Sequence, residues 1–349
     1  MSDNIRVGLI GAGANTKLQH IPGFKKIDGV EIVSVTNRSI ASSQAVADEY
    51  EIPNVIDNWI DVVESPDNDA ICIGTWPYMH HPMVLMALEC NKHVLTEARM
   101  AMNSVEANEM LTASKINQDL VTQIVPAPHT FKIDKTVKRL LSENAIGEIL
   151  SVDLNISLNG FVETESPVHW RQIRDFSGNN VMALGIWYET LMRWIGEASS
   201  VIALSRVHVK SRKSEDGKNN VLTIPDHLEI LSEMYSGPLA HIKMSNVTGL
   251  ASSDNAWLFG TEGTLFIDLE NLNVFLGKRG DSKLEPVSIP KNEVGVWRVE
   301  EEFINAIRGD EIITHTSFED GVRYMEFIDA VQLSAQTVSY THLTLPTKA

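Results

Sequence analysis

A glycine-containing loop near the N-terminus has the residue types and spacing needed to bind a dinucleotide. The apolar stretch Val7 to Ile10 runs into Gly11-Ala12-Gly13-Ala14-Asn15-Thr16, and a helix is expected over Lys17 to Lys26. The first glycine permits a tight turn, and the second lets a pyrophosphate approach backbone amides at a helix start. Thr16 stands at the third glycine position, which indicates looser packing of helix on strand. We predict pyrophosphate contacts from Gly11, Gly13, Ala14, Asn15 and Thr16.

Taken alone, such a match is often only a turn. Here a second strand is expected over Glu31 to Thr36, which favours a cofactor loop. Enzymes that use NAD usually place an acidic residue after this strand, and this chain has Asn37-Arg38-Ser39. Asn37 and Ser39 can donate hydrogen bonds, while Arg38 can stack on adenine or pair with a 2'-phosphate. We therefore expect NADP, with NAD as the alternative, unless Arg38 is simply a solvated cation.

A loop after the fourth predicted strand, Ala70 to Gly74, should border the same cofactor. Loops at the carboxyl ends of parallel strands line the cofactor crevice, so contacts are expected from Thr75, Trp76 and His80. His80 and His81 are adjacent and would point apart on a helix. No other metal-ligand spacing accompanies them, and no metal site is predicted.

The order of elements predicts an α/β Rossmann domain followed by an α+β domain with a large open antiparallel sheet. Up to about residue 125, short apolar runs alternate with helix-period segments, as in a parallel sheet covered on both faces. After Pro126, Leu150 to Leu158 alternates strictly between apolar and polar residues, which is typical of a half-exposed strand. The predicted domains are 1–125 and 126–337. Residues 338–349 have no periodicity and no expected partner, and we interpret them as a non-native tail.

Composition excludes several classes of protein. The net charge is -17 over 349 residues, so binding to the phosphate backbone of nucleic acid is disfavoured. The sequence has no apolar run long enough to span a bilayer and no signal-like N-terminus, so we expect a soluble, cytoplasmic protein. The two cysteines, Cys72 and Cys90, are expected to be structural thiols.

Further motifs make the chain resemble the Gfo/Idh/MocA family of NAD(P)-dependent oxidoreductases from Ile5 to Thr337. Thr75 to His80 stands in place of the family's T-P-N-x-x-H, and Lys92 to Glu97 in place of the start of K-H-V-x-x-E-K-P. The other similar segments are Ile146-Gly147-Glu148-Ile149, Trp170-Arg171, Ser177-Gly178, Gly260-Thr261-Glu262-Gly263-Thr264 and Ser317-Phe318-Glu319-Asp320-Gly321. The resemblance implies reversible hydride transfer to or from a secondary alcohol of a sugar, cyclitol or related polyol. It also implies a homo-oligomer, a dimer or tetramer, formed through the sheet of the second domain.

The residues that carry proton transfer in that family are replaced here. The family uses the lysine of E-K-P and an Asp and a His from D-x-G-x-H. This chain reads Glu97-Ala98-Arg99 and Ala183-Leu184-Gly185-Ile186-Trp187. Neither alanine nor the indole of Trp187 can act as a general base near neutral pH. Glu97 and Ala98 are still expected beside the cofactor, where the resemblance places this motif.

Several residues are candidates for the missing chemistry. Arg99 stays protonated and would orient substrate, while Tyr188 could relay a proton or simply pack in its helix. Glu189 could be a base, although an ion pair with Arg193 at i,i+4 also explains it. The candidate acid–base histidines are His129 and His169, either of which could instead be structural. Asp226 and His227 rank lower, and the expected substrate contacts are Arg99, Trp170, Arg171, Trp187 and Tyr188.

Three functions stay open on this evidence. The first is an NAD(P)-dependent oxidoreductase of a sugar or polyol with a non-standard acid–base set. The second is a cofactor-binding sensor without turnover, which the loss of the family's Lys, Asp and His favours. The third is a glycosidase that oxidises and reduces its sugar within one cycle. The polar and aromatic residues around Arg99, Trp170 and Tyr188 argue against an inactive site.

Overall fold

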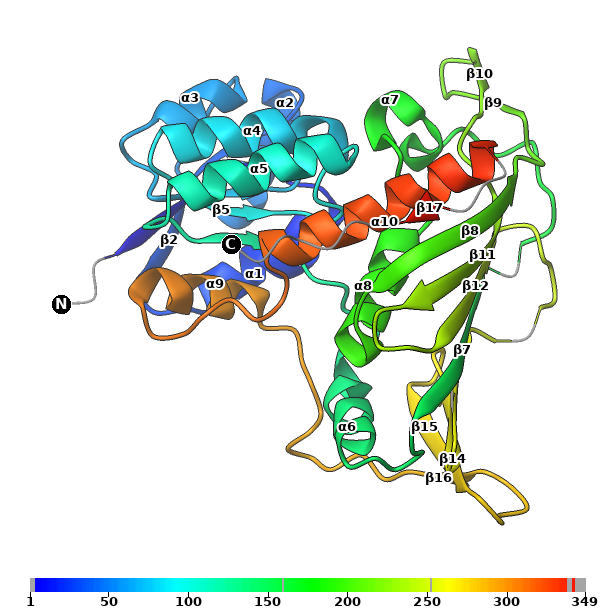
Figure 1. Ribbon diagram of the computed structural model, residues 1–349. Coiled ribbons are helices and arrows are strands. Elements are labelled where there is room, and N and C mark those ends of the chain that lie inside the picture. The colour runs from blue at the N-terminus through cyan, green and yellow to red at the C-terminus, as the bar shows by residue number, and fades with distance from the viewer. Residues whose placement is uncertain (1–3, 159, 252, 338–340, 343–349) are drawn as a thin grey trace. The chain divides into compact units, whose positions relative to one another are not determined.

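The computed structural model describes residues 4–158, 160–251, 253–337 and 341–342, which form two compact units (Figure 1). The first contains the chain up to Pro126 together with Arg298–Met325, and the second contains Ala127–Trp297 and the described residues from Glu326 onward. The predicted boundary near residue 125 did not assign Arg298–Met325 to the first unit. This segment returns because helix α9 (Val299–Arg308) packs on α1 (Ile21–Lys25), where Phe303 meets Phe24 edge-on at 6.5 Å.

The first unit is built on a parallel sheet of strand order β3-β2-β1-β4-β5-β6. Its strands are β1 (Ile5–Ile10), β2 (Val30–Thr36), β3 (Asn54–Val55), β4 (Ala70–Ile73), β5 (His93–Thr96) and β6 (Thr122–Ile124). The order reverses between β1 and β4. In open α/β sheets, this switch point is where ligands bind. The Rossmann part of the predicted fold is confirmed.

Helices follow the strands of the first unit and begin at side-chain caps where the sequence supplies them. They are α2 (Ile40–Tyr50), α3 (Trp59–Glu64), α4 (Pro77–Glu89) and α5 (Ser104–Ile116). Asn103 caps α5, because its Oδ1 accepts the Glu106 amide at 3.0 Å. The segment predicted as one helix over Lys17 to Lys26 differs. It contains a π-helical turn, Thr16–His20, directly before α1.

The second unit contains a nine-stranded sheet of order β16-β15-β14-β13-β7-β12-β11-β8-β17. Its strands are β7 (Ile149–Ser157), β8 (Ala198–Arg206), β11 (His227–Met234), β12 (Leu239–Ser245), β13 (Asn255–Gly260), β14 (Gly263–Asp268), β15 (Asn273–Lys278), β16 (Glu285–Pro286) and β17 (Thr341–His342). The pairing is antiparallel except between β7 and β12, which run parallel. The sheet is therefore mixed, where the sequence predicted an antiparallel one. A separate ribbon pairs β9 (Ser211–Lys213) with β10 (Asn219–Val221).

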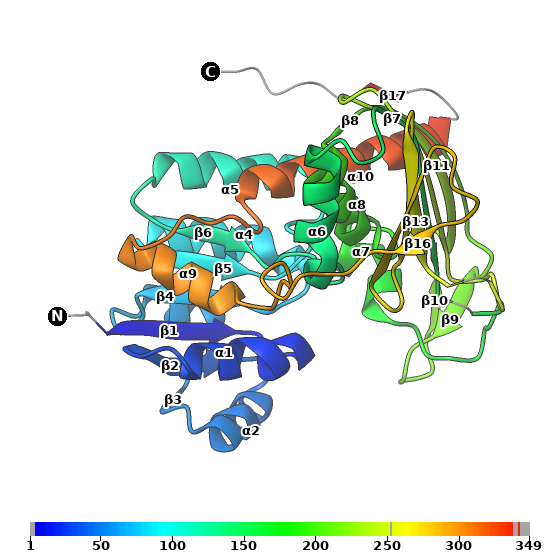
Figure 2. The same cartoon turned by 90° about the horizontal axis from the view of Figure 1, so that it is seen from below.

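Helices of the second unit lie on one face of this sheet, as Figure 2 shows for α6 (Phe131–Ser142), α8 (Leu184–Ile195) and the latter part of α10 (Phe318–Thr337). A short α7 (Arg174–Ser177) precedes α8. On β7, Val152, Leu154 and Ile156 are buried, whereas Leu150 is exposed, so the strict alternation predicted the buried face correctly.

Part of the segment set aside as a tail has a partner. Thr341–His342 forms β17, which pairs with Val201 and Ser200 of β8. The absence of periodicity did not reveal this pairing, since two residues at a sheet edge need no amphipathic pattern. The rest of the predicted tail lies outside the described residues.

Candidate functional site

The loops after β1 and β4 touch at the switch point of the first sheet. Gly11 has a φ of +85°, and a Cβ there would stand 2.8 Å from the Thr75 methyl group. A Cβ on Gly74 would lie 2.1 Å from the Gly11 carbonyl oxygen and 2.2 Å from Thr16 Oγ1. Thr16 is buried and its hydroxyl donates to the Gly11 carbonyl at 3.1 Å. Thr16 thus stabilises the glycine loop and does not line the pocket described next.

A pocket of about 510 Å³ opens over this contact. It is lined by Ile10, Gly11, Ala12, Gly13, Thr36, Asn37, Arg38, Ser42, Asp57, Asn58, Trp59, Gly74, Thr75, Trp76, Tyr78, Met79 and Met83. Of the predicted cofactor contacts, it contains Gly11, Gly13, Asn37, Arg38, Thr75 and Trp76. It does not contain Ala14, Asn15, Thr16, Ser39, His80, Glu97 or Ala98. Ser42, Asp57 and Trp59 were missed, because turns and helix starts outside the glycine loop carry no fingerprint.

The pocket fits the adenosine and pyrophosphate of a dinucleotide. No protein atom lies closer than 3.8 Å to a Cβ built on Gly13, so this backbone faces open space. Trp76 presents its ring to the Arg38 guanidinium at 4.9 Å, a cation–π contact at the pocket wall. The volume and the aromatic and cationic lining are those expected of a nucleotide site.

The polar groups after β2 have other partners than we expected. Asn37 Oδ1 accepts the Ala12 amide at 2.7 Å, and its Nδ2 donates to the Ser42 carbonyl at 3.1 Å. Ser39 caps α2 by accepting from the Ser42 amide. Asn37 therefore positions the glycine loop and Ser39 positions a helix, whereas Arg38 lines the pocket.

His80 is a fully buried bridge between loops. Its Nδ1 lies 3.0 Å from the Arg99 carbonyl oxygen, and its Nε2 lies 3.1 Å from the Thr75 carbonyl oxygen. Burial lowers the pKa of His80 against the opposing effect of these carbonyls. Arg99 is itself 5% exposed. His80 thus holds the Thr75 loop and the Ala98–Arg99 segment together.

A buried charge cluster lies beneath the same loops, and the sequence did not predict it. The His20 imidazole has 0% exposed surface and lies between two carboxylates, with Nδ1 2.5 Å from Glu300 Oε1 and Nε2 3.1 Å from Glu97 Oε1. Asn15 also donates to Glu97. Burial opposes charging of His20, but these carboxylates raise its pKa to about 9. Although burial also disfavours a charged Glu97, its contacts with His20 and Asn15 hold the pKa of Glu97 below the ordinary value.

In the second unit, the two replaced family positions line a pocket of about 400 Å³. Ala183 and Trp187 come from the start of α8, and His129 comes from the segment after Ala127. The His129 ring stacks on the Trp187 indole with centroids 5.2 Å apart and planes at 21°. The other lining residues are Ile156, Leu158, Met182, Met244, Ser245, Asn246, Asp254, Leu269, Glu270 and Leu272. An imidazole therefore lies beside the position where the family's histidine is missing.

The surroundings of His129 lower the pKa of its imidazole. Part of its surface faces solvent, but neighbouring side chains desolvate the ring and lower its pKa. Arg193 lowers this pKa further, and Asp254 opposes the shift. The imidazole is thus neutral at pH 7 and can accept a proton. Among the described residues, its ring nitrogens have no hydrogen-bond partner.

Tyr188 and Glu189 belong to the core of the second unit. The Tyr188 phenol is 1% exposed, accepts the Ala198 amide at 2.8 Å and stacks on Phe327 with centroids 3.7 Å apart. Glu189 accepts the Ala127 amide at 3.1 Å and pairs with Arg193 at 2.8 Å. These contacts favour the packing interpretation of Tyr188 and the ion-pair interpretation of Glu189.

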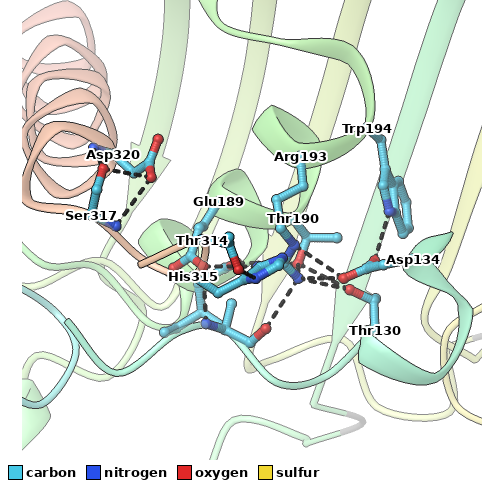
Figure 3. Close-up of polar contacts among 12 residues, drawn as sticks. Thr130, Asp134, Glu189, Thr190, Arg193, Trp194, Thr314, His315, Ser317 and Asp320 are labelled. Atoms are coloured by element: carbon cyan, nitrogen blue, oxygen red, sulfur yellow. Dashed lines mark hydrogen bonds and ion pairs between the residues drawn. The ribbon is translucent and has the colours of Figure 1, made fainter. Parts of the chain in front are cut away.

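Arg193 is the centre of this buried network (Figure 3). Its guanidinium also pairs with Asp134 at 3.0 Å and donates to Thr130 Oγ1 at 3.0 Å. Asp134 in turn accepts the Trp194 indole N–H at 2.7 Å. The network fixes the chain on both sides of His129, because it binds Ala127 and Thr130 at once.

The remaining candidates have local structural contacts. His169 Nδ1 accepts the Arg171 amide at 3.3 Å and thereby caps a short 3-10 turn, Trp170–Gln172. The Arg171 guanidinium lies 4.3 Å from the Trp170 ring. Asp226 accepts the backbone amides of His208 and Val209, and His227 bonds to Ser245 Oγ. The pocket that contains His129 is not lined by any of these five candidates, His169, Trp170, Arg171, Asp226 and His227.

Family models match both the Rossmann part and the C-terminal part of the chain. Residues 5–124 match the model of an oxidoreductase family with an NAD-binding Rossmann fold, and residues 135–266 match the Gfo/Idh/MocA C-terminal domain. The chain belongs to the Gfo/Idh/MocA oxidoreductase family. It is a nicotinamide-dinucleotide-dependent oxidoreductase, and its predicted resemblance and enzyme class are confirmed.

Known members of the family resemble it at low identity. An oxidoreductase of Formosa agariphila is 27% identical over 80% of this chain and 84% of its own length. Levoglucosan dehydrogenase of Pseudarthrobacter phenanthrenivorans is 22% identical over 76% and 74%. The structure of a levoglucosan dehydrogenase with NADH and L-sorbose has a TM-score of 0.85 and 21% identity, covering 98% of this chain and 99% of that one. At this identity the structural match shows the fold alone.

The described residues form neither a metal site nor a membrane-spanning helix. They contain no group of three or more His, Cys, Asp or Glu side chains arranged to hold a metal ion. No helix in the described part of the chain is both long and apolar enough to cross a bilayer.

The His20 cluster predicts how stability depends on pH. A folded pKa of about 9, against 6.5 for an ordinary histidine, gives a stabilisation that is complete below pH 6.5 and disappears as the pH rises through 9. Urea unfolding of the wild type between pH 6 and 10 should therefore show a loss of stability that His20→Asn largely lacks. The matched control is His208→Asn at an exposed position. Parallel pH profiles for wild type and His20→Asn would contradict a charged His20.

Proposed function

We propose that this protein transfers hydride between NADP and a secondary hydroxyl or carbonyl of a sugar, cyclitol or related polyol, with His129 as the acid–base group. The observation that carries this proposal is the His129 ring, stacked on Trp187 in the pocket that the replaced positions line. Removing hydride from an alcohol carbon requires that the hydroxyl proton be accepted by a nearby group. A neutral imidazole meets that need, and Ala183 and Trp187 do not.

Each part of the chain has a defined task in this scheme. The nicotinamide, when bound, supplies the hydride acceptor or donor. The glycine loop, Thr75 and Trp76 hold the dinucleotide, and the Arg193 network fixes the backbone on either side of His129. His129 takes the proton during oxidation and returns it during reduction. Arg99, Trp170 and Arg171 stay candidate substrate contacts, now secondary to the residues that line the His129 pocket.

Relatives support the substrate class. The levoglucosan dehydrogenase named above is a relative, and so is a trans-1,2-dihydrobenzene-1,2-diol dehydrogenase of Danio rerio, at 25% identity over 67% of this chain. Both names specify hydroxylated ring compounds. A partly apolar pocket wall with an aromatic platform suits such rings.

Turnover by a His129 variant tests the proposal directly. Wild type supplied with NADP or NAD and a panel of polyols should generate absorbance at 340 nm, and His129→Asn should lower kcat by about 10²- to 10⁴-fold, the usual contribution of a general base. Cofactor affinity should be unchanged. His169→Asn is the matched control, since asparagine can replace its capping contact, and its kcat should stay within about threefold of the wild type.

The same assay separates the rival functions. Cofactor binding without turnover of any polyol would favour the sensor, and sugar release from glycosides without net reduction would favour the glycosidase. An equal loss of activity in His129→Asn and His169→Asn would remove His129 from the mechanism. Failure to bind either cofactor would overturn the whole proposal.

The preference for NADP rests on Arg38. This cation lines the nucleotide pocket, and the strand end before it has no acidic residue for a ribose 2'-hydroxyl. Its stacking on Trp76 leaves the guanidinium edge available for a phosphate. We expect Arg38→Ala to weaken NADP binding by about 10- to 100-fold, as for the loss of a charge-assisted hydrogen bond, and NAD binding by less than about threefold.

Calorimetric titration of both cofactors into the variant measures this difference. Lys115→Ala, which removes an exposed cation outside the pocket, is the control and should change neither affinity. Wild-type protein that binds NAD more tightly than NADP would refute the preference.

The proposal includes a homo-oligomer formed through the sheet of the second unit. The face of the sheet opposite α8 carries two apolar pairs in one row, Ile202 with Leu231 and Trp257 with Phe266, which are separated by His241 and Asp153. Ile202 and Leu231 are 43% and 59% exposed, and the Trp257 and Phe266 rings lie 4.4 Å apart. Apolar pairs on an open sheet face, with polar residues between them, suit a subunit interface.

Charged substitutions on this face should dissociate the oligomer. The double variant Ile202→Lys with Leu231→Lys is expected to elute with the mass of one chain in light-scattering chromatography, because four lysines would meet in a two-fold contact. Val221→Lys, at a 77% exposed position of β10, should leave the mass unchanged. A monomeric wild type would contradict the proposed interface.

A further inference from the structure

The His20 cluster joins the glycine loop to the chain that follows β5. The His20 imidazole contacts Glu300 and Glu97, and Asn15 of the glycine loop donates to the same Glu97 oxygen at 2.5 Å. We propose that His20 is a positioning residue for the bound dinucleotide, which it serves by setting the separation of the loops after β1 and β5. This role goes beyond the proposed hydride transfer, because it concerns how the cofactor is held.

The position of Glu97 at the end of β5 places the cluster beside the cofactor crevice. The nucleotide pocket is lined by turns after β1, β2, β3 and β4, and it accommodates adenosine and pyrophosphate. The rest of a dinucleotide must leave this pocket across the carboxyl ends of the neighbouring strands. β5 pairs with β4, and Glu97 is the first residue after it. We therefore expect the nicotinamide half between the loop after β5 and the glycine loop.

Each of these two loops is anchored on its own side. The Ala12 amide donates to Asn37 Oδ1 at 2.7 Å, which ties the glycine loop to the end of β2. The Glu97 amide donates to the Ile73 carbonyl at 2.9 Å, which ties the start of the other loop to β4. Side chains span the distance between the loops, and their contacts converge on one oxygen, Glu97 Oε1.

The first helix makes room for this cluster with a glycine. Gly23 lies within α1, where glycine is much less favourable than alanine. A Cβ on Gly23 would stand 2.5 Å from Glu300 Oε2. The Glu300 carboxylate, which is 2% exposed, thus occupies the space of a side chain and lies against His20 Nδ1. An unfavourable glycine that admits a buried carboxylate indicates a site shaped around the imidazole.

Charge holds the cluster in this arrangement. Burial opposes charging of His20, but its hydrogen bonds to Glu300 and Glu97 raise its pKa to about 9, so both ring nitrogens donate at pH 7. A neutral imidazole has one donor, and deprotonation would leave one carboxylate contact unmade. Cys72 of β4 and His80 of α4 also interact electrostatically with Glu97. Burial raises the pKa of Cys72 and lowers that of His80, so both are neutral at pH 7.

Binding of a whole dinucleotide and of ADP tests this role. ADP contains only the adenosine and pyrophosphate groups, and calorimetric titration gives its affinity and that of NADPH, or of NADH if NADH binds more tightly. We expect His20→Asn to weaken dinucleotide binding at pH 7 about tenfold and ADP binding less than about twofold, because Asn37 anchors the glycine loop independently of His20. A general loss of structure would weaken both ligands equally.

A second variant disturbs the cluster from the opposite side. Gly23→Ala must displace the Glu300 carboxylate and leaves His20 and Glu97 in place. Because alanine is favourable in a helix, we expect this variant to fold, which its unfolding temperature verifies. Dinucleotide affinity should fall at least about threefold and ADP affinity less than about twofold. His208→Asn, at an exposed position of the second unit, is the control and should change neither affinity.

The pH profile gives a readout that a merely structural role would not move. Since the charge of His20 is lost as the pH rises through about 9, wild-type dinucleotide affinity should fall between pH 8 and 10 toward that of His20→Asn. The affinity of the variant should stay nearly constant over this range. Parallel pH profiles would overturn the inference, as would equal weakening of ADP and dinucleotide in His20→Asn. Unchanged dinucleotide affinity in both variants would also refute it and would leave the proposed role of His129 standing.

Discussion

The contact between Gly11 and Gly74 is the constraint on which the first unit depends. Any side chain at Gly74 would collide with the Gly11 carbonyl and with the Thr16 hydroxyl. Because the strand order reverses between β1 and β4, a crevice opens beyond their carboxyl ends, and the touching loops after the two strands form its floor. Thr16 helps to hold this floor, since its hydroxyl bonds to Gly11 where the usual motif has a third glycine.

The second unit depends on a comparable buried interaction around Arg193. A guanidinium paired with two carboxylates is costly to bury, and its value lies in the segments that it joins. It connects α8 to α6, to the Ala127 carbonyl oxygen and to the Thr130 hydroxyl. His129 stands between those two residues, so a buried ion-pair network fixes the chain on both sides of the imidazole that we propose as the acid–base group.

The fold was predictable to a large extent, because hydrophobic periodicity reports local burial. The alternation over β7 is a signal of this kind. The parallel pairing of β7 with β12 was not, since strand direction depends on connections between distant segments. The same holds for Arg298–Met325, whose return to the first unit rests on contacts such as that between Phe303 and Phe24.

The candidate sites were predictable only where a motif is continuous in sequence. Gly11 and Gly13 lie in the nucleotide pocket as expected, but Ser39 has the local task of capping a helix. Tyr188 directly follows Trp187, which stands at the family's histidine position. Its side chain nevertheless points into the core, because neighbouring residues of a helix face different sides. Glu300 lies 280 residues from His20, and no spacing rule relates two residues so far apart.

The π-helical turn Thr16–His20 adds a geometric consequence to the first helix. Each residue of an α-helix advances the chain by about 100° around the axis. His20 ends the wide turn and Phe24 follows four residues later, so both lie on one side of the helix, where His20 faces Glu97 and Glu300 and Phe24 faces Phe303. Thr16 begins the wide turn and bonds to Gly11, so shortening the turn by one residue would rotate Thr16 by about 100° relative to His20. The glycine loop and the buried His20 cluster are thus coupled through a single extra residue.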